Sequence, residues 1–174
     1  ITKNYSFLYD MEFYPFYFNR IGEYIFITFT MKGKLYISIR GDRPEPYELR
    51  TSLFKKVRLE LDAYESCNVH INCYNYLRLA YSDIKSQICS YLNIYPEGEI
   101  EFCGYSSGGS VAIIATIKFQ YIYQFNRFHC TTFGSFKPGG TTLSNKIRKL
   151  PGRIQNSLLE DDLISSLPPE DQGY

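Results

Sequence analysis

The 174-residue sequence contains no tryptophan, no apolar run long enough to cross a bilayer, and no large excess of charge of either sign. Its formal net charge is +1, and so weak a field gives no reason to expect nucleic acid as the main partner. No secretory signal peptide is visible. The sequence does not begin with methionine, so Ile1 is not expected to be the natural start.

The cysteines are odd in number and lack the spacing of a metal site. They are Cys67, Cys73, Cys89, Cys103 and Cys130. Cys103 and Cys130 fall inside strand-like runs, so buried free thiols in a reducing compartment are expected. Free thiols without a visible signal peptide favour an intracellular location, although the localisation itself is left open. No metal and no organic cofactor are expected.

Tyrosine and phenylalanine are abundant, with 17 and 13 copies, and 44 % of the residues are hydrophobic. A chain of this length and composition predicts one globular domain over residues 1–174, with a core that is largely aromatic. The aromatic excess in residues 5–18 is expected to be part of that core.

Periodicity predicts an α/β fold. Alternating apolar residues predict a β-hairpin over residues 24–39, and further strands are expected at 57–61, 128–133 and 153–155. Apolar residues at steps of three and four predict a helix over residues 74–92. Strands and helices alternate from residue 57 onward. The expected architecture is a mainly parallel sheet covered by helices, with an antiparallel hairpin at one edge.

Residues 99–117 predict a strand, a sharp turn and a helix, with the GxSxG pattern Gly104 to Gly108 at the turn. Such a bend pushes the hydroxyl of Ser106 out of the sheet and places it at a helix N-terminus, so Ser106 is a candidate nucleophile. A chance match to the short pattern is the plain alternative. A phosphate-binding loop is disfavoured, because no lysine follows the glycines.

Several segments, in order, resemble the class 3 lipases, the fungal triacylglycerol lipase type of α/β-hydrolase. They are Ile39-Arg40-Gly41, Val69-His70, Gly104 to Gly109, Thr132-Phe133-Gly134-Ser135, Asn156, and Leu167-Pro168-Pro169 followed by Gly173-Tyr174. The resemblance covers about residues 24 to 174, and it implies an α/β-hydrolase fold with a Ser, Asp, His triad in that chain order.

The resemblance implies that Ser106 attacks an ester carbonyl and that Asp162, five residues before Leu167, orients the imidazole. Asp161 is the fallback, because the spacing back to Asn156 is longer than in the family. Without the resemblance, the acidic residues 160–162 would read as a solvated turn.

The oxyanion hole would be formed by the backbone N–H groups of Ser107 and Asp42. The sequence departs from the family here, because family members usually have serine or threonine at the position of Asp42. It also has Tyr105 where the family mostly has histidine, and Ser107 where it mostly has leucine.

The catalytic histidine of the family lies just beyond the Gly-aromatic pair, and this sequence ends at Tyr174. His70 matches a structural position of the family, and His129 falls in a predicted strand. Two explanations stay open. Either the full-length chain continues past Tyr174, so that the C-terminal part of the domain is missing here, or the domain has no base and is inactive.

Residues 43–56 fall where the family carries its lid. As a lid, the segment would cover the acyl pocket with its apolar side chains and control access to it. These side chains are Tyr47, Leu49, Leu53 and Phe54. A surface loop with a few core anchors is the equal alternative.

The sequence and the resemblance together predict a lipase-like serine hydrolase. It would cleave carboxylic esters of lipids, of acylglycerol type, through an acyl-enzyme on Ser106, and it would contact a lipid interface at the membrane surface. The alternative is a catalytically inactive lipase-fold domain with a structural or binding role. A peptidase or acyltransferase on the same fold is a weaker third hypothesis. The oligomeric state is left undetermined.

Overall fold

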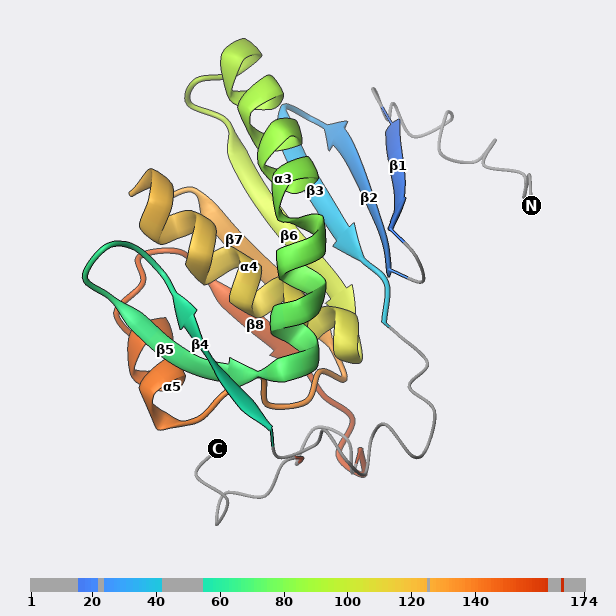
Figure 1. Ribbon diagram of the computed structural model, residues 1–174. Coiled ribbons are helices and arrows are strands. Elements are labelled where there is room, and N and C mark those ends of the chain that lie inside the picture. Colours follow the sequence, from blue (N-terminus) through green and yellow to red (C-terminus); the bar gives the residue numbers. More distant parts are fainter. Residues whose placement is uncertain (1–15, 22–23, 42–54, 125, 163–166, 168–174) are drawn as a thin grey trace.

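The computed structural model describes residues 16–21, 24–41, 55–124, 126–162 and 167 (Figure 1). The strands of the main sheet are β1 (Phe16–Ile21), β2 (Tyr24–Met31), β3 (Lys34–Ile39), β6 (Glu99–Tyr105), β7 (Phe128–Phe133) and β8 (Ile154–Ser157). They lie in the spatial order β1-β2-β3-β6-β7-β8. The first three pair antiparallel, and β3, β6, β7 and β8 run parallel. This is the α/β sheet that the sequence predicts.

The hairpin predicted for residues 24–39 is formed by β2 and β3. Met31 pairs with Lys34, so Lys32 and Gly33 alone make the turn. Their φ angles are 49° and 72°, and positive φ at both positions is typical of a type I′ turn, whose twist matches that of the strands. Alternate residues of β3 are buried, as the period of two requires.

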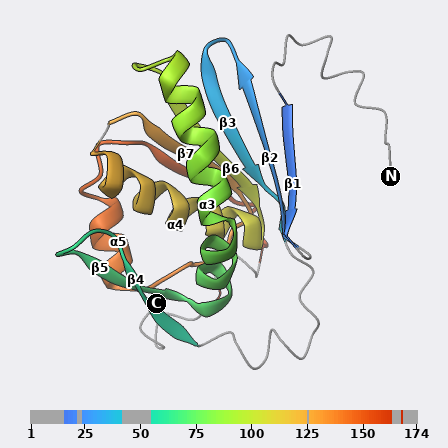
Figure 2. The same cartoon turned by 45° about the horizontal axis from the view of Figure 1, so that its top comes forward.

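Two helices, α3 (Ile71–Ile94) and α4 (Ser107–Tyr123), pack against each other and cover one face of the main sheet (Figures 1 and 2). The buried residues of α3 recur mostly at steps of three and four, which confirms the helix predicted for residues 74–92. That helix is longer than predicted at both ends. At its start, Nδ1 of His70 accepts a hydrogen bond of 3.3 Å from the N–H of Asn72.

Aromatic rings fill the core between the sheet and the helices, as the composition predicts. Phe102 on β6 stacks on Phe119 of α4 with ring centroids 5.8 Å apart. Phe119 also stacks on Tyr81 of α3 at 5.4 Å and lies 6.5 Å from Phe128 of β7. The three phenylalanines are completely buried. They join four elements that are far apart in the sequence.

A second, two-stranded sheet consists of β4 (Lys56–Glu60) and β5 (Ser66–His70), paired antiparallel. The strand predicted at 57–61 therefore exists, but it lies outside the main sheet. The reason is a tight reversal, in which Oδ1 of Asp62 accepts hydrogen bonds of 2.8 Å from the N–H groups of Tyr64 and Glu65. The chain folds back at once and pairs with its own continuation.

Two further details differ from the sequence prediction. The short helix α5 (Thr141–Ile147) was not expected, and β8 begins one residue later and ends two residues later than the strand predicted at 153–155. Residues 5–15 of the aromatic N-terminal segment lie outside the described residues, and residues 16–18 belong to β1. Within the described part of the chain, no helix has both the length and the apolar character needed to span a membrane.

Candidate active site

Ser106 stands alone between the end of β6 and the first residue of α4. Its backbone has φ 55° and ψ −128°, a combination that residues with a side chain adopt rarely. Its N–H donates a hydrogen bond of 2.9 Å to the carbonyl of Phe133, and its carbonyl accepts one of 3.0 Å from the N–H of Gly109. These bonds hold the bend in place, so the strand, turn and helix predicted for residues 99–117 are present.

Glycines allow the backbone segments around Ser106 to touch. A Cβ on Gly104 would lie 2.4 Å from the carbonyl oxygen of Gly108, and a Cβ on Gly108 would lie 2.4 Å from the carbonyl oxygen of Ile39. A Cβ on Gly41 would lie 2.6 Å from the carbonyl oxygen of Tyr105. No side chain fits at these points, so the first turn of α4 rests directly on β6 and on the end of β3.

A hollow of about 500 Å³ lies beside Ser106. Its lining residues are Ser38, Ile39, Arg40, Gly41, Cys103, Gly104, Tyr105, Ser106 and Phe133. Burial raises the pKa of the Cys103 thiol to about 12, and the nearby charge of Glu101 adds to the effect. The thiol is therefore neutral near pH 7 and a poor competitor for an electrophile bound next to Ser106.

The residues expected to form the oxyanion hole lie on either side of the bend. Ser107 is the first residue of α4, where backbone N–H groups point out of the helix and favour negative charge. The place where a Cβ of Gly41 would stand is 3.4 Å from Cβ of Ser106, so the segment after β3 reaches the candidate nucleophile. Asp42, the next residue, lies outside the described residues.

Asp162 lies against the turn that follows β7. Its Oδ2 atom is 3.0 Å from the place where a Cβ of Gly134 would stand, and Cε2 of Tyr105 is 3.6 Å from the same place. Gly134 directly follows Phe133, whose carbonyl binds Ser106. The structure thus brings the candidate acid and the candidate nucleophile to the same turn. Asp161, the fallback, is exposed on the chain just before it.

The two histidines of the sequence stand on β5 and β7, away from the bend that carries Ser106 in the chain. His70 caps α3, is 3 % exposed, and packs edge-on against Phe136 with ring centroids 5.2 Å apart. His129 is on β7, four residues before Phe133, which corresponds to about 13 Å along the strand. Its Nδ1 accepts a hydrogen bond of 3.2 Å from the N–H of Arg153. The lining of the hollow beside Ser106 includes neither imidazole.

A polar network supports the site, and the sequence interpretation gave it no role. Oγ1 of Thr132, which is completely buried, donates a hydrogen bond of 2.9 Å to Oδ1 of Asn156. Thr132 also bonds the hydroxyl of Ser135 at 3.3 Å. A Cβ on Gly109 would lie 2.8 Å from Cβ of Ser135, so the network packs directly under the first turn of α4. Residues 132–135 and Asn156 are among the segments that resemble the class 3 lipases, and that resemblance is the signal that marks them in the sequence.

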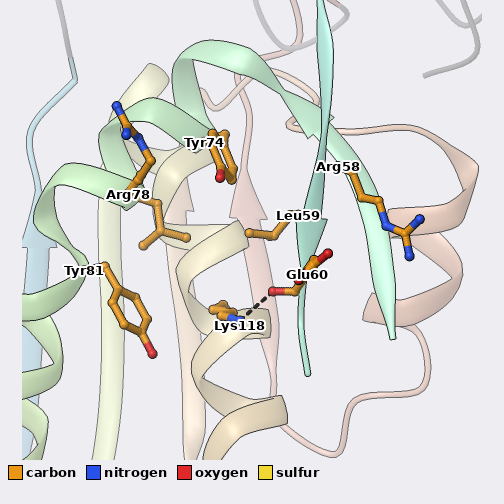
Figure 3. A pocket seen from close by; sticks show the side chains of 8 residues that line it. Arg58, Leu59, Glu60, Tyr74, Arg78, Tyr81 and Lys118 are labelled. Atoms are coloured by element: carbon orange, nitrogen blue, oxygen red, sulfur yellow. Dashed lines mark hydrogen bonds between the residues drawn. The ribbon is translucent and has the colours of Figure 1, made fainter. Parts of the chain in front are cut away.

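A second hollow, of about 410 Å³, lies between β4, α3 and α4 (Figure 3). Lys118 in its wall donates hydrogen bonds to the carbonyls of Glu60 and Leu61, at 2.5 and 3.1 Å. Burial lowers the pKa of Lys118, against the opposing charges of Glu60 and Asp62. Figure 3 shows the guanidinium groups of Arg58 and Arg78 pointing to opposite sides of the hollow. The positive charges of the two arginines and Lys118 therefore do not converge on one point of the hollow. The hydrogen bonds of Lys118 attach α4 to the end of β4.

The four apolar residues of the expected lid, Tyr47, Leu49, Leu53 and Phe54, lie outside the described residues. The expectation of a lid over residues 43–56 therefore stays a prediction.

Comparison with known proteins places this geometry in a family. The sequence model described as lipase (class 3) matches residues 36–172. No curated protein matches the sequence. Among solved structures, a Rhizomucor miehei lipase propeptide complex has a TM-score of 0.77 at 16 % identity, over 94 % of this chain and 54 % of its own.

A lipase from Rhizopus microsporus var. chinensis has a TM-score of 0.79 at 15 % identity, over 93 % of this chain and 57 % of its own. Lipase II from Rhizopus niveus has a TM-score of 0.80 at 14 % identity, over 92 % of this chain and 62 % of its own. This chain thus spans between 54 % and 62 % of the length of these three structures. It belongs to the class 3 lipase family and has the α/β-hydrolase fold of the fungal triacylglycerol lipases.

Proposed function

We propose that the protein is a lipase-like serine hydrolase that cleaves carboxylic esters of lipids, of acylglycerol type, through an acyl-enzyme on Ser106. The observation that carries the proposal is the strained backbone of Ser106 between β6 and α4, with an open hollow of about 500 Å³ beside it. Family membership supplies the substrate class, because lipid esters are what the family name implies.

In the proposed reaction, Oγ of Ser106 attacks the ester carbonyl while its proton passes to an imidazole. The backbone N–H groups of Ser107 and Asp42 stabilise the negative charge that develops on the carbonyl oxygen. Collapse of the tetrahedral intermediate breaks the ester bond, and the departing alcohol takes the proton back. A water molecule then hydrolyses the acyl-enzyme by the same steps. Asp162 orients the imidazole and stabilises its charged form.

The reaction needs a histidine base, and the positions of His70 and His129 do not suit either of them to that role. The hydrolase proposal therefore depends on an imidazole from outside these 174 residues. Without such a base, serine is a weak nucleophile and the rate falls by several orders of magnitude.

Proposed contact with a lipid surface is supported by an apolar rim at the ends of three neighbouring strands. The rim consists of Tyr105 at the end of β6, Phe133 at the end of β7, and Leu158 and Leu159 after β8, with exposed fractions between 51 % and 80 %. Tyr105 and Phe133 also line the hollow beside Ser106. Apolar groups gathered beside a candidate active site suit a substrate that is itself part of a lipid layer.

A fluorophosphonate probe tests the proposal. In the full-length protein, the probe should label one serine, and mass spectrometry of the labelled peptide should identify it as Ser106. The Ser106→Ala variant should lose the label, while Ser90→Ala, which alters an exposed serine on α3, should keep it. Labelling that persists in Ser106→Ala, or a folded protein that takes no label, contradicts the proposal.

A second candidate function is favoured by the positions of the two histidines. If no imidazole reaches Ser106, the domain is an inactive lipase fold kept for binding or assembly. A full-length protein that is folded by circular dichroism, but neither takes the probe nor hydrolyses short and long acyl esters, supports this alternative. Comparison of ester hydrolysis with amide cleavage and with acyl transfer to alcohols tests the peptidase and acyltransferase hypotheses.

A further inference from the structure

The turn of residues 133–135, at the end of β7, lies next to both the candidate nucleophile and the candidate acid. The carbonyl of Phe133 accepts the N–H of Ser106 at 2.9 Å. Beside the next residue, Gly134, Oδ2 of Asp162 lies 3.0 Å from the place where a Cβ would stand. A movement of this turn would therefore change the position of one candidate group relative to the other.

Gly134 has φ +54°, in the left-handed region that favours glycine. Its N–H donates a hydrogen bond of 2.9 Å to the carbonyl of Ser157, the last residue of β8. The chain then needs only five residues to reach Asp162, whose N–H donates to the carbonyl of Leu159 at 3.1 Å. The hydrogen bond between Gly134 and Ser157 thus joins the turn at Gly134 to the first residue of the loop that carries Asp162.

The carboxylate of Asp162 occupies space that a side chain at position 134 would need. Oδ2 of Asp162 lies 3.0 Å from the place of the absent Cβ, and the ring of Tyr105 lies 3.6 Å from it. A contact of 3.0 Å is tighter than ordinary van der Waals contact, so an added methyl group would push the carboxylate away. The absence of a Cβ at position 134 therefore leaves room for the carboxylate where it stands, and a Cβ there would displace it by a few tenths of an ångström.

The buried network under the turn prevents the turn itself from moving instead. Thr132 bonds Asn156 on β8 at 2.9 Å and Ser135 at 3.3 Å, so both ends of the turn are fixed to neighbouring groups. Thr132 and Ser135 are almost completely buried. Because these ends are held, a steric change at Gly134 acts on the loop of Asp162, which is more exposed.

We propose that Gly134 is a positioning residue, whose left-handed turn sets the place of the Asp162 carboxylate relative to Ser106. The inference rests on the proposed function, which assigns Asp162 its role as the catalytic acid. It adds Gly134 as a residue on which the relative position of Ser106 and Asp162 depends. Misplacement by about an ångström reduces catalysis about a hundredfold in well-organised active sites, so a shift of a few tenths of an ångström at the carboxylate should cost a smaller factor.

The first experiment measures position without requiring activity. Amide hydrogen exchange of the Gly134→Ala variant should be faster than wild type in residues 157–162, and unchanged in α3. Gly33→Ala is the matched control, because Gly33 also has a positive φ, of 72°, but has open space where its Cβ would stand. Exchange in residues 157–162 that is equal in Gly134→Ala and wild type overturns the proposal, whether or not the protein is a hydrolase.

The second experiment is a double-mutant cycle on ester hydrolysis by the full-length protein. Gly134→Ala should lower kcat about 3- to 10-fold with KM nearly unchanged, because the displaced carboxylate orients the imidazole and does not bind the substrate. In the Asp162→Ala background, the same change should cause no further loss. Losses that multiply in the double variant show a general structural effect and overturn the positioning role.

Gly134→Asn separates strain from contact, because asparagine tolerates positive φ but still carries a Cβ. Its loss of kcat should equal that of Gly134→Ala, with a smaller loss of stability in urea. A Gly134→Asn variant with wild-type kcat overturns the contact argument. If the wild-type protein itself hydrolyses no ester, the proposed function fails, and the hydrogen-exchange result still decides the role of Gly134.

Discussion

Lys34 on β3 forms an ion pair of 2.8 Å with Glu101 on β6, and Oγ1 of Thr131 donates a hydrogen bond of 2.7 Å to the same carboxylate. Phe102 faces α4, so its neighbour Glu101 points to the opposite face of the sheet. The side chain of Glu101 is nevertheless only 5 % exposed. A carboxylate so well buried depends on its partners.

Lys34→Met should therefore lower the free energy of unfolding by about 3 kcal/mol, because it leaves Glu101 without its cation. The double variant with Glu101→Gln should recover part of that loss. Urea unfolding measures both, with Lys149→Met on an exposed loop as the control. Equal losses in Lys34→Met and Lys149→Met would show that the pair contributes nothing.

Gly108→Ala should lower the free energy of unfolding by about 3 kcal/mol, because its Cβ would lie 2.4 Å from the carbonyl oxygen of Ile39. Gly33→Ala, at a turn with open space, should lower it by only about 1 kcal/mol, the cost of a positive φ. Denaturant unfolding compares the two variants. Similar losses would mean that the close approach of α4 to β3 is not tightly packed.

The fold was largely predictable because its strongest signals are local. The hairpin of β2 and β3 follows from alternation around Lys32 and Gly33, and the bend at Ser106 follows from glycines and a small-residue helix. The sequence prediction assigned the strand at 57–61 to the main sheet, whereas β4 pairs with β5 in a separate sheet. Alternation of apolar residues predicts a strand but does not show which strand it pairs with. The reversal at Asp62 decides the pairing. Helix α5 was missed because Gly140 gives it no side-chain cap.

The candidate site was less predictable. The placement of Asp162 beside Gly134 depends on a turn that joins β7 to β8, and contacts between distant segments leave no periodic pattern in a single sequence. The hydrogen bond from Thr132 to Asn156 could not be predicted from the sequence either. A buried threonine in a strand looks the same whether it bonds a side chain such as Asn156 or only fills space.

Replacing Leu158 and Leu159 together by serine should weaken binding to phosphatidylcholine vesicles about tenfold, which corresponds to about 1.4 kcal/mol of lost apolar contact. Ile94→Ser is the matched control, because Ile94 is 71 % exposed at the far end of α3. Co-sedimentation with vesicles measures binding. If Ile94→Ser weakens vesicle binding as much as the double change at Leu158 and Leu159, the apolar rim does not form a specific lipid-binding surface.

Stability should decline as the pH rises above 9, because buried thiols keep their protons in the folded state. Burial raises the pKa of Cys67 to about 11 and that of Cys103 to about 12, from 9.0. Between pH 9 and about pH 11, the thiols of the unfolded chain lose their protons while those of the folded chain keep them, so a rise in pH favours unfolding. The stabilising contribution is fully present below pH 9.

Urea midpoints between pH 8 and pH 11 test this decline, and Cys103→Ala should show a shallower slope than wild type. At pH 8, a thiol reagent should modify the exposed Cys89 first, the partly buried Cys103 more slowly, and Cys67, Cys73 and Cys130 only after unfolding. Modification of Cys103 as fast as that of Cys89 in the folded protein would contradict the neutral state of the Cys103 thiol.

The parallel pairing of β3 with β6 has a consequence for the order in which the chain assembles. β6, α4 and β7 follow one another closely and form a compact unit around Phe119, whereas β3 must reach β6 across residues 40–98. Closing that long loop is entropically costly, so the unit around Phe119 is expected to form first and the hairpin to dock late. Stopped-flow refolding should then show Phe119→Leu slowing folding, and Leu35→Ala mainly speeding unfolding.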